Sequence, residues 1–271
     1  NWTFFVRSGW ASLAGATAGI SPTMWGGDQN TDWGRDDGLP SVLPIALHLG
    51  LAGVSIFGSD IAGYSSFTTP HTDKELFYRW ASFGALQPLM RTHHGSSECA
   101  NWSFDRDEET IAHYRRWAGI HTLLFPYFKI LLHQAQTLGL PMMRHPYLAA
   151  PSSSAFWRRA VDAFFLGDDL LVTPIVEQGS TSREVVLPGP GWWPLFGNVP
   201  MAEAPDADGV VSVQLEVPVT EAPVFVRPGT ILPLLPRVVN SMFGATVEGV
   251  SDLSDVSGFR RLALYPTADG S

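Results

Sequence analysis

The chain has 271 residues, a formal net charge of −9 and 45% hydrophobic residues. The acidic balance argues against a nucleic-acid partner or an anionic membrane surface, since both require a basic face. No apolar run reaches the roughly 18 residues that a membrane span needs. A single cysteine, Cys99, excludes an internal disulfide and leaves the redox compartment open.

The first part of the chain has the pattern of a parallel α/β fold. Apolar strands are predicted at 4–6 and 54–57, and Pro40 is well placed to begin a helix between them. Each predicted strand is followed by polar residues, which places Arg7 and then Asp60 at strand tips. Carboxylates and aromatic residues after the carboxyl ends of such strands usually belong to a site.

One more strand-and-helix unit follows. Thr72 and Glu75 form a predicted capping box for the next helix, and residues 88–90 form a third strand that ends in polar residues. A long helix is then predicted from about residue 105 to Leu138, kinked where a proline interrupts it and stopped by Gly139.

Short strands separated by proline and glycine dominate the rest of the chain. After a short helix at 156–164, strands are predicted at 170–176, 183–187, 210–217, 224–226 and 231–235. This spacing is typical of an antiparallel β-sandwich. The tail from Val238 starts no clear element.

These patterns divide the chain into three parts. Residues 1–146 are predicted to be part of a barrel, 147–236 a β-sandwich, and 237–271 a tail or the start of a truncated β region. A complete eight-stranded α/β barrel takes about 250 residues, and the first part holds only three strand–helix units. We therefore expect the front part of the barrel to belong to an N-terminal portion of the same polypeptide that this sequence does not contain.

Two carboxylates at the strand tips are candidates for catalysis. Asp28 lies in a Gly-Gly-Asp turn near Trp25, where an aromatic neighbour can raise the pKa of an acid and make it a general acid. The alternative is an aspartate that only caps a turn. Asp60 is either the second carboxylate of a glycosidase pair or a buried partner of Arg7 or Arg91.

The histidines argue against a metal site. His93 and His94 follow the third strand, but the sequence contains no His-Glu-x-x-His run and no Cys/His cluster. We expect neither a metal nor a cofactor, and a neutral imidazole donating to a sugar hydroxyl suits His93 better. A Gly-x-Ser-x-Gly elbow is also absent from the sequence. Asn1-Trp2-Thr3 and Asn101-Trp102-Ser103 fit the N-glycosylation pattern.

Motifs spread along the chain carry a family resemblance. In order they are Arg7-Ser8-Gly9, Trp25-x-Gly27-Asp28, Gly58-x-Asp60-Ile61-x-Gly63-Tyr64, Arg79-Trp80, Arg91-Thr92-His93, Gly167-Asp168-x-Leu170-Leu171-Val172-x-Pro174, and the run from Pro223 to Pro233. They closely resemble family 31 of the glycoside hydrolases, the α-glucosidase family. The resemblance implies a (β/α)8 barrel followed by a proximal β-sandwich and a distal β domain.

The resemblance also implies roles for single residues. Asp28 matches the general acid/base. The remaining matches are to sugar-contacting positions of the −1 subsite (Arg7, His93), aromatics lining it (Trp25, Tyr64) and a site-wall carboxylate (Asp60). From its position at a strand tip, Arg91 is predicted to be a supporting residue that orients a carboxylate or a substrate hydroxyl, and the alternative is an ordinary salt bridge at the barrel rim. The nucleophilic aspartate of the family lies on an earlier strand that this sequence does not contain. We therefore expect the isolated chain to be inactive.

The resulting prediction is a retaining α-glycosidase fragment that releases terminal α-linked glucose. Asp28-Gln29-Asn30 differs from the commoner Gly-Asp-Asn form and resembles the branch with bacterial α-glucosidases and sulfoquinovosidases. The alternatives are a sulfoquinovosidase or α-xylosidase, and, from another class, a non-catalytic carbohydrate-binding module. Arg7 and Arg91 are expected to pair with the two carboxylates, which leaves no spare cation for a sulfonate and favours a neutral glucosyl substrate.

Overall fold

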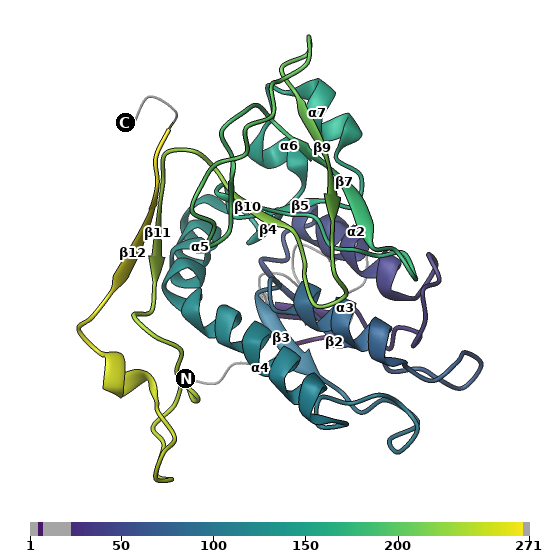
Figure 1. Cartoon of the computed structure of the whole chain (residues 1–271). Coiled ribbons are helices and arrows are strands. Elements are labelled where there is room, and N and C mark those ends of the chain that lie inside the picture. Colours follow the sequence, from purple (N-terminus) through teal and green to yellow (C-terminus); the bar gives the residue numbers. More distant parts are fainter. Residues whose placement is uncertain (1–4, 8–22, 268–271) are drawn as a thin grey trace.

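The computed structural model describes residues 5–7 and 23–267. They form a barrel fragment joined to antiparallel β sheets (Figure 1). The Ser8-Gly9 part of the first motif and the pattern at 1–3 lie outside the described residues. Within the described ranges, no helix is long and apolar enough to cross a membrane.

The barrel fragment contains a three-stranded parallel sheet in the order β1-β2-β3. Its strands are β1 (Thr23–Trp25), β2 (Ile56–Ile61) and β3 (Leu89–Thr92), connected by helices α2 (Leu39–Leu51) and α3 (Lys74–Gly84). Val6, from the strand predicted at 4–6, forms a parallel bridge to Met24. Strand–helix–strand units in a parallel sheet confirm the α/β class of this part.

Two local predictions in this region were wrong. Strand β2 begins later than predicted and ends at Ile61, so Asp60 lies inside the strand, where the neighbouring strand supplies its partner. Helix α3 is capped by Asp73, whose side chain accepts a hydrogen bond from the Leu76 N–H at 2.8 Å. The Thr72 hydroxyl instead donates to the Ala62 carbonyl at 2.8 Å, in the loop after β2. No local sequence pattern predicted the short strand β1.

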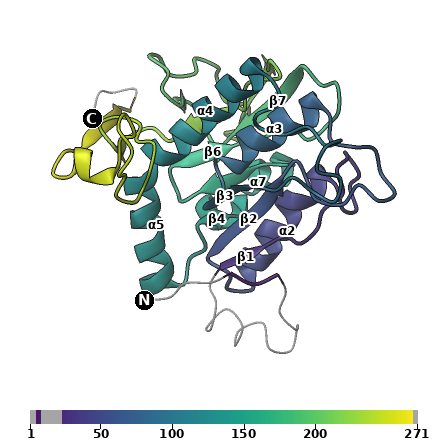
Figure 2. The same ribbon diagram turned by 90° about the horizontal axis from the view of Figure 1, so that it is seen from below.

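The long predicted helix is two helices, α4 (Glu108–Leu123) and α5 (Phe125–Leu138). The chain changes direction between them (Figures 1 and 2). Pro126 has no N–H to continue the hydrogen bonding of α4, and it lies in the first turn of α5, where no such N–H is needed. The predicted stop is confirmed: Gly139 caps α5 in the left-handed conformation, with φ of 71°.

The C-terminal part is built on a five-stranded antiparallel sheet in the order β4-β5-β6-β10-β8. Its strands are β4 (Met143–Arg144), β5 (Phe164–Leu166), β6 (Leu170–Val172), β10 (Val224–Val226) and β8 (Trp193–Pro194). The strands β7 (Ser182–Leu187) and β9 (Val211–Glu216) form a second antiparallel pair. The helix predicted at 156–164 is shorter, since α7 (Ser154–Arg159) ends before Phe164 enters β5; the four-residue helix α6 (Pro146–Ala149) precedes it.

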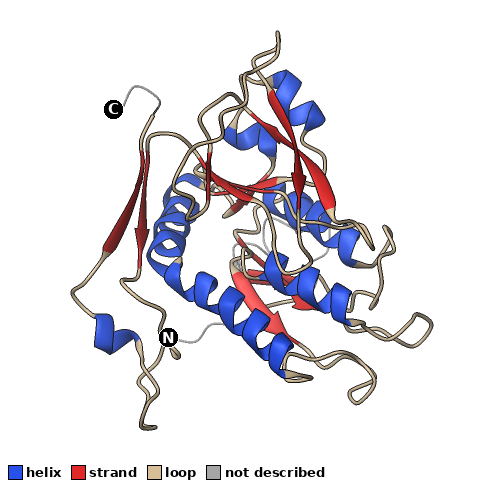
Figure 3. Cartoon of the chain, viewed as in Figure 1, coloured by secondary structure: helices blue, strands red, loops and turns tan. Residues whose placement is uncertain are grey.

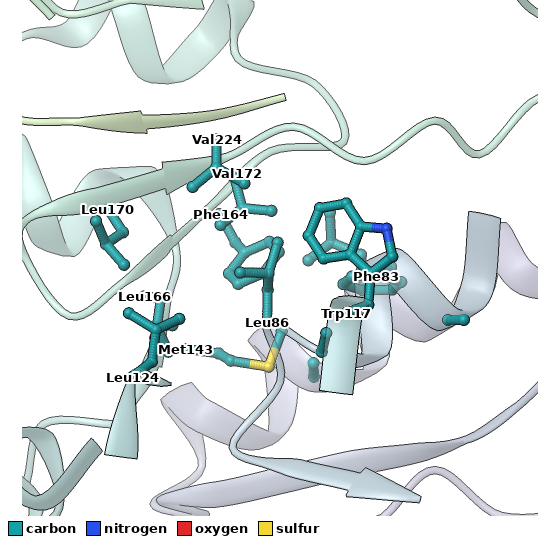
Figure 4. Packing of buried hydrophobic residues seen from close by; sticks show 14 of the residues in the cluster. Phe83, Leu86, Trp117, Leu124, Met143, Phe164, Leu166, Leu170, Val172 and Val224 are labelled. Carbon is teal, nitrogen blue, oxygen red and sulfur yellow. The ribbon is translucent and has the colours of Figure 1, made fainter. Parts of the chain in front are cut away.

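Successive side chains of these strands point to opposite faces of the sheet, and each face packs in a different hydrophobic core. Phe165, Leu171 and Phe225 pack in one core with Val185 and Val211 of the β7–β9 pair, which gives the predicted sandwich. Their sequence neighbours face the other way and join the core of the barrel helices, as Figure 4 shows for Phe164, Leu166, Leu170, Val172 and Val224 near Phe83, Trp117 and Leu124.

Arg79 of the Arg79-Trp80 motif connects the two parts. Its buried guanidinium donates to the carbonyls of Ser180, Val217, Pro218 and Glu221 at 2.7–3.1 Å. Burial lowers the pKa of Arg79. Loops of the β part are thereby fixed to helix α3 of the barrel.

The tail contains elements that were not predicted. A 3₁₀ helix covers Leu253–Val256, and β12 (Arg261–Tyr265) pairs antiparallel with β11 (Thr230–Leu234). This ribbon lies beyond α5 at one side of the molecule (Figures 1 and 3). The partners are about thirty positions apart in the sequence, so no local pattern indicated the pairing.

Candidate active site

Three strands present polar or aromatic side chains on one face of the parallel sheet. Successive side chains of a strand point to opposite faces of the sheet. Phe57 and Ile61 of β2 lie in the core with the helices, so Asp60, at an odd number of positions from each, points to the opposite face. Trp25 is in register with Gly58, and Asp60 with Arg91. Registered neighbours share a face, so Trp25, Asp60 and Arg91 lie together on the interior side of the barrel fragment.

Asp60 and Arg91 form an ion pair in which the carboxylate is buried and the guanidinium is partly buried. The distance from Arg91 Nη2 to Asp60 Oδ1 is 2.8 Å, and the two side chains are 24% and 2% exposed. The contact lacks hydrogen-bond geometry, since this carboxylate oxygen has no hydrogen-bond partner in the described structure. Burial raises the pKa of Asp60, and the Arg91 charge opposes that effect. Of the alternatives in the sequence, pairing of Asp60 with Arg91 is confirmed; its contact with a sugar stays a prediction.

Asp28 pairs with the other arginine. Arg7 Nη2 lies 3.0 Å from Asp28 Oδ2 in a pair that solvent reaches, with side chains 57% and 36% exposed. Gly27, with φ of 96°, supplies the left-handed turn immediately before Asp28. The carboxyl is therefore accessible to a substrate at the open end of the strands.

Aromatic rings form a wall beside these pairs. Phe5 meets Trp25 edge-to-face, with ring centroids 5.3 Å apart. The Arg91 guanidinium lies over both rings, 5.2 Å from the Phe5 centroid and 5.6 Å from that of Trp25. Phe5 was not among the predicted site residues, and nothing in its local sequence distinguishes it from an ordinary strand residue.

Tyr64 and His93 lie together on the next two loops. Their rings meet edge-to-face with centroids 5.0 Å apart. The Gly95 N–H donates to His93 Nδ1 at 3.0 Å, so the proton of the neutral imidazole is on Nε2. That tautomer makes Nε2 a hydrogen-bond donor, as the predicted contact with a sugar hydroxyl requires.

Backbone hydrogen bonds connect the loops that carry Asp28, Tyr64 and His93. The Gln29 carbonyl accepts from the N–H groups of Tyr64 and Ser65 at 2.8 and 2.9 Å, and the Tyr64 carbonyl accepts from Ser96 at 2.8 Å. Gly63 has φ of 79°, and a Cβ there would lie 2.7 Å from the Asn30 carbonyl oxygen. The relative position of the three side chains therefore depends on close backbone approach.

Asn101 has a structural role that its sequence pattern does not indicate. Its side chain is buried, accepts from the Thr72 N–H at 3.1 Å and donates to the His94 carbonyl at 3.2 Å. The amide that a glycosylation pattern would expose is thus used to hold the loop after His93. Over the described ranges, no group of three or more His, Cys, Asp or Glu is arranged to hold a metal ion.

The fold and this site define a class of protein. An accessible carboxyl, arginines and aromatic rings lie at the carboxyl ends of the parallel strands, where barrel enzymes have their active sites. Residues 4–130 match the glycosyl hydrolases family 31 TIM-barrel domain and residues 139–232 match the glycosyl hydrolase family 31 C-terminal domain. The chain belongs to glycoside hydrolase family 31, as its motifs indicated.

The relatives of this chain include both sulfoquinovosidases and an α-glucosidase. The chain is 40% identical over 189 residues to a sulfoquinovosidase of Escherichia coli K12, covering 70% of this chain and 27% of that protein. It is 35% identical over 213 residues to a probable glucan 1,3-alpha-glucosidase of Oryza sativa, covering 78% and 21%. A solved family 31 sulfoquinovosidase from E. rectale, in complex with an aza-sugar inhibitor, has a TM-score of 0.74 at 29% identity, covering 84% of this chain and 32% of that one. The chain thus spans at most about a third of the length of these relatives.

Proposed function

We propose that this chain forms the acid/base side of a retaining α-glycosidase that removes terminal α-linked glucose. The observation that carries the proposal is the accessible Asp28 carboxyl at a barrel-strand tip, 3.0 Å from Arg7 and on the loop after the Trp25 wall. A carbohydrate-binding module has no use for an acid at this place.

In this proposal Asp28 works in both steps of the reaction. As an acid it protonates the leaving glycosidic oxygen, and once deprotonated it activates the water that releases the sugar. The nucleophile is an aspartate from an N-terminal portion of the same polypeptide, about 5–5.5 Å from the Asp28 carboxyl, as in retaining enzymes. Arg7 and His93 orient sugar hydroxyls, and the reaction needs no cofactor.

Charge pairing supports a neutral glucosyl substrate. Arg7 and Arg91 each have a carboxylate within 3.0 Å, so neither is spare to neutralise a bound sulfonate. A buried anion without a cationic partner is unfavourable. Tyr64 can donate its hydroxyl to a 6-hydroxymethyl group or to a 6-sulfonate, and therefore does not discriminate.

A sulfoquinovosyl substrate is the second candidate. It is favoured by the names of two of the relatives above, at 40% and 29% identity. The basic residues that such a substrate requires would then come from the N-terminal portion. An α-xylosidase would use the same catalytic machinery.

The test uses the full-length polypeptide that contains this chain. We expect kcat/KM for an aryl α-glucoside to exceed that for the matching aryl α-sulfoquinovoside, and the opposite order would overturn the glucosyl assignment while keeping the mechanism. Proton NMR during the first turnovers should show the α-anomer, whereas an initial β-anomer contradicts retention. The isolated chain of 271 residues is the control without a nucleophile. Turnover by it would contradict the need for an upstream aspartate.

A further inference from the structure

Asp60 is buried before the barrel is complete. It is 1% exposed in this chain, whose parallel sheet has three strands. Further strands add atoms, and added atoms do not expose a residue that is already covered. A sugar in the barrel interior therefore meets the groups above Asp60 and not its carboxylate.

Arg91 lies between this carboxylate and the aromatic wall. One end of its guanidinium contacts Asp60 at 2.8 Å, and its Cζ lies over the rings of Phe5 and Trp25, 5.2 and 5.6 Å from their centroids. The Asp60 carboxylate and the two aromatic rings thus fix the position of the Arg91 guanidinium. Arginine suits this arrangement because its planar guanidinium pairs with a carboxylate and stacks on aromatic faces at the same time.

We infer that Asp60 is a positioning residue, which holds Arg91 against Trp25 and Phe5 and so fixes the aromatic wall of the sugar site without touching the sugar. The inference rests on the proposed function, since it concerns the same site. It differs from the role that the family resemblance implies for Asp60, a carboxylate in the wall of the −1 subsite.

The charges of Asp60 and Arg91 depend on each other. A buried carboxylate is unfavourable without a cation, so removing Arg91 alone leaves Asp60 uncompensated. Removing Asp60 alone frees the guanidinium to turn towards solvent, and the Trp25 ring then loses one of its neighbours. Changes at the two residues must consequently be strongly non-additive.

The experiment is a double-mutant cycle in the full-length enzyme. Asp60→Asn, Arg91→Met and the double variant are assayed on an aryl α-glucoside and on its 2-, 3-, 4- and 6-deoxy analogues. We expect Asp60→Asn to lower kcat/KM by about 10- to 100-fold, mainly through KM, by the same factor on every analogue. The kcat/KM of the double variant should be no lower than that of the less active single variant. If Asp60→Asn did not lower kcat/KM on one of the deoxy analogues, Asp60 would contact the missing hydroxyl directly. If the decrease of kcat/KM in the double variant equalled the product of the two single decreases, the residues would have independent roles. Either result overturns the inference.

Two further measurements separate positioning from folding. Arg91→Lys keeps the charge but not the planar stacking, so it should not restore kcat/KM; full restoration would contradict the role of the rings. The double variant should have a higher Tm than Arg91→Met, because it lacks the uncompensated carboxylate. A lower Tm would show that the two residues do not depend on each other.

A control ion pair lies far from the site. Asp206→Asn breaks the exposed Arg159–Asp206 pair of 2.6 Å in the β part and should leave kcat/KM unchanged. If the wild-type enzyme hydrolyses no α-glycoside, the proposed function fails, and the Tm comparison still decides whether Asp60 and Arg91 are coupled.

Discussion

The Arg7 guanidinium lies 3.0 Å from the Asp28 carboxylate, and solvent reaches both side chains. The second arginine–carboxylate pair of the site, Arg91 with Asp60, is of similar length but has a carboxylate only 2% exposed. Exposure therefore separates the two pairs: one can meet a substrate directly, and the other supports the wall beside it.

Replacing Arg7 tests the exposed pair. In the proposed function Arg7 donates a hydrogen bond to a sugar hydroxyl. A hydrogen bond to a charged group contributes about 1.5–3 kcal/mol, so Arg7→Met in the full-length enzyme should lower kcat/KM by roughly 10- to 150-fold. Arg7→Lys keeps the charge without the fork of donors and should recover only part of this loss. Steady-state kinetics on an aryl α-glucoside measure both. Unchanged kinetics in Arg7→Met would mean that the pair serves stability alone.

Replacing Asp28 tests the acid/base role. Losing a general acid–base typically lowers the rate by about 10²–10⁴-fold, so Asp28→Ala should severely slow substrates with poor leaving groups. Activated aryl glycosides should be affected less, and azide should partly restore their turnover by replacing the activated water. Asp36→Ala, at an exposed aspartate of the following loop, is the matched control. Equal losses on both substrate types, with no azide effect, would assign Asp28 a structural role.

Gly63 tests the connection between the loops of Asp28 and Tyr64. Gly63→Ala places a Cβ 2.7 Å from the Asn30 carbonyl oxygen at φ of 79°. We expect a lower Tm together with loss of activity, since strain of this kind costs about 1–3 kcal/mol and the loops must separate. Gly139→Ala is the control, because its φ of 71° is similar but nothing lies within 4 Å. If the two variants lose the same Tm and both stay active, close approach at Gly63 is unimportant.

His113 makes stability depend on pH. It is buried, its Nε2 lies 3.1 Å from the Tyr78 carbonyl oxygen, and its ring stacks on that of Tyr78 at 4.0 Å. Burial lowers the pKa of His113 from 6.5 to about 4. Between these values the unfolded chain binds a proton that the folded chain does not, so stability falls as pH decreases from about 6.5 to 4, by about 3 kcal/mol.

Removing His113 should flatten this slope. His113→Gln retains a donor for the Tyr78 carbonyl but does not titrate, so Tm measured from pH 7 to pH 4 should decrease less than in the wild type. Burial also lowers the pKa of His121, which acts in the same direction and leaves part of the slope in place. Identical slopes in wild type and variant would contradict the assignment.

Local patterns in the sequence determined the class of fold and the predicted position of the site. Apolar strands that end in polar residues indicated the parallel units, because side-chain alternation and helical periodicity are properties of short segments. The glycine stop at Gly139 and the alternating strand at β9 have the same local origin. The motifs from Arg7 to Pro233 identified the family, and the predicted acid/base role of Asp28 comes from that resemblance.

Only the tertiary structure decided which groups meet. The register of β2 and β3 pairs Asp60 with Arg91 and buries it, which the sequence left open between two arginines. Phe5 at the aromatic wall, Asn101 under the His93 loop and the pairing of β12 with β11 were likewise not predicted. Apart from the hydrogen bond between Asn101 and His94, seven positions away, these contacts join residues far apart in the chain. The energy of each contact depends on distance and burial after folding, and neither quantity is encoded in the pattern around a single residue.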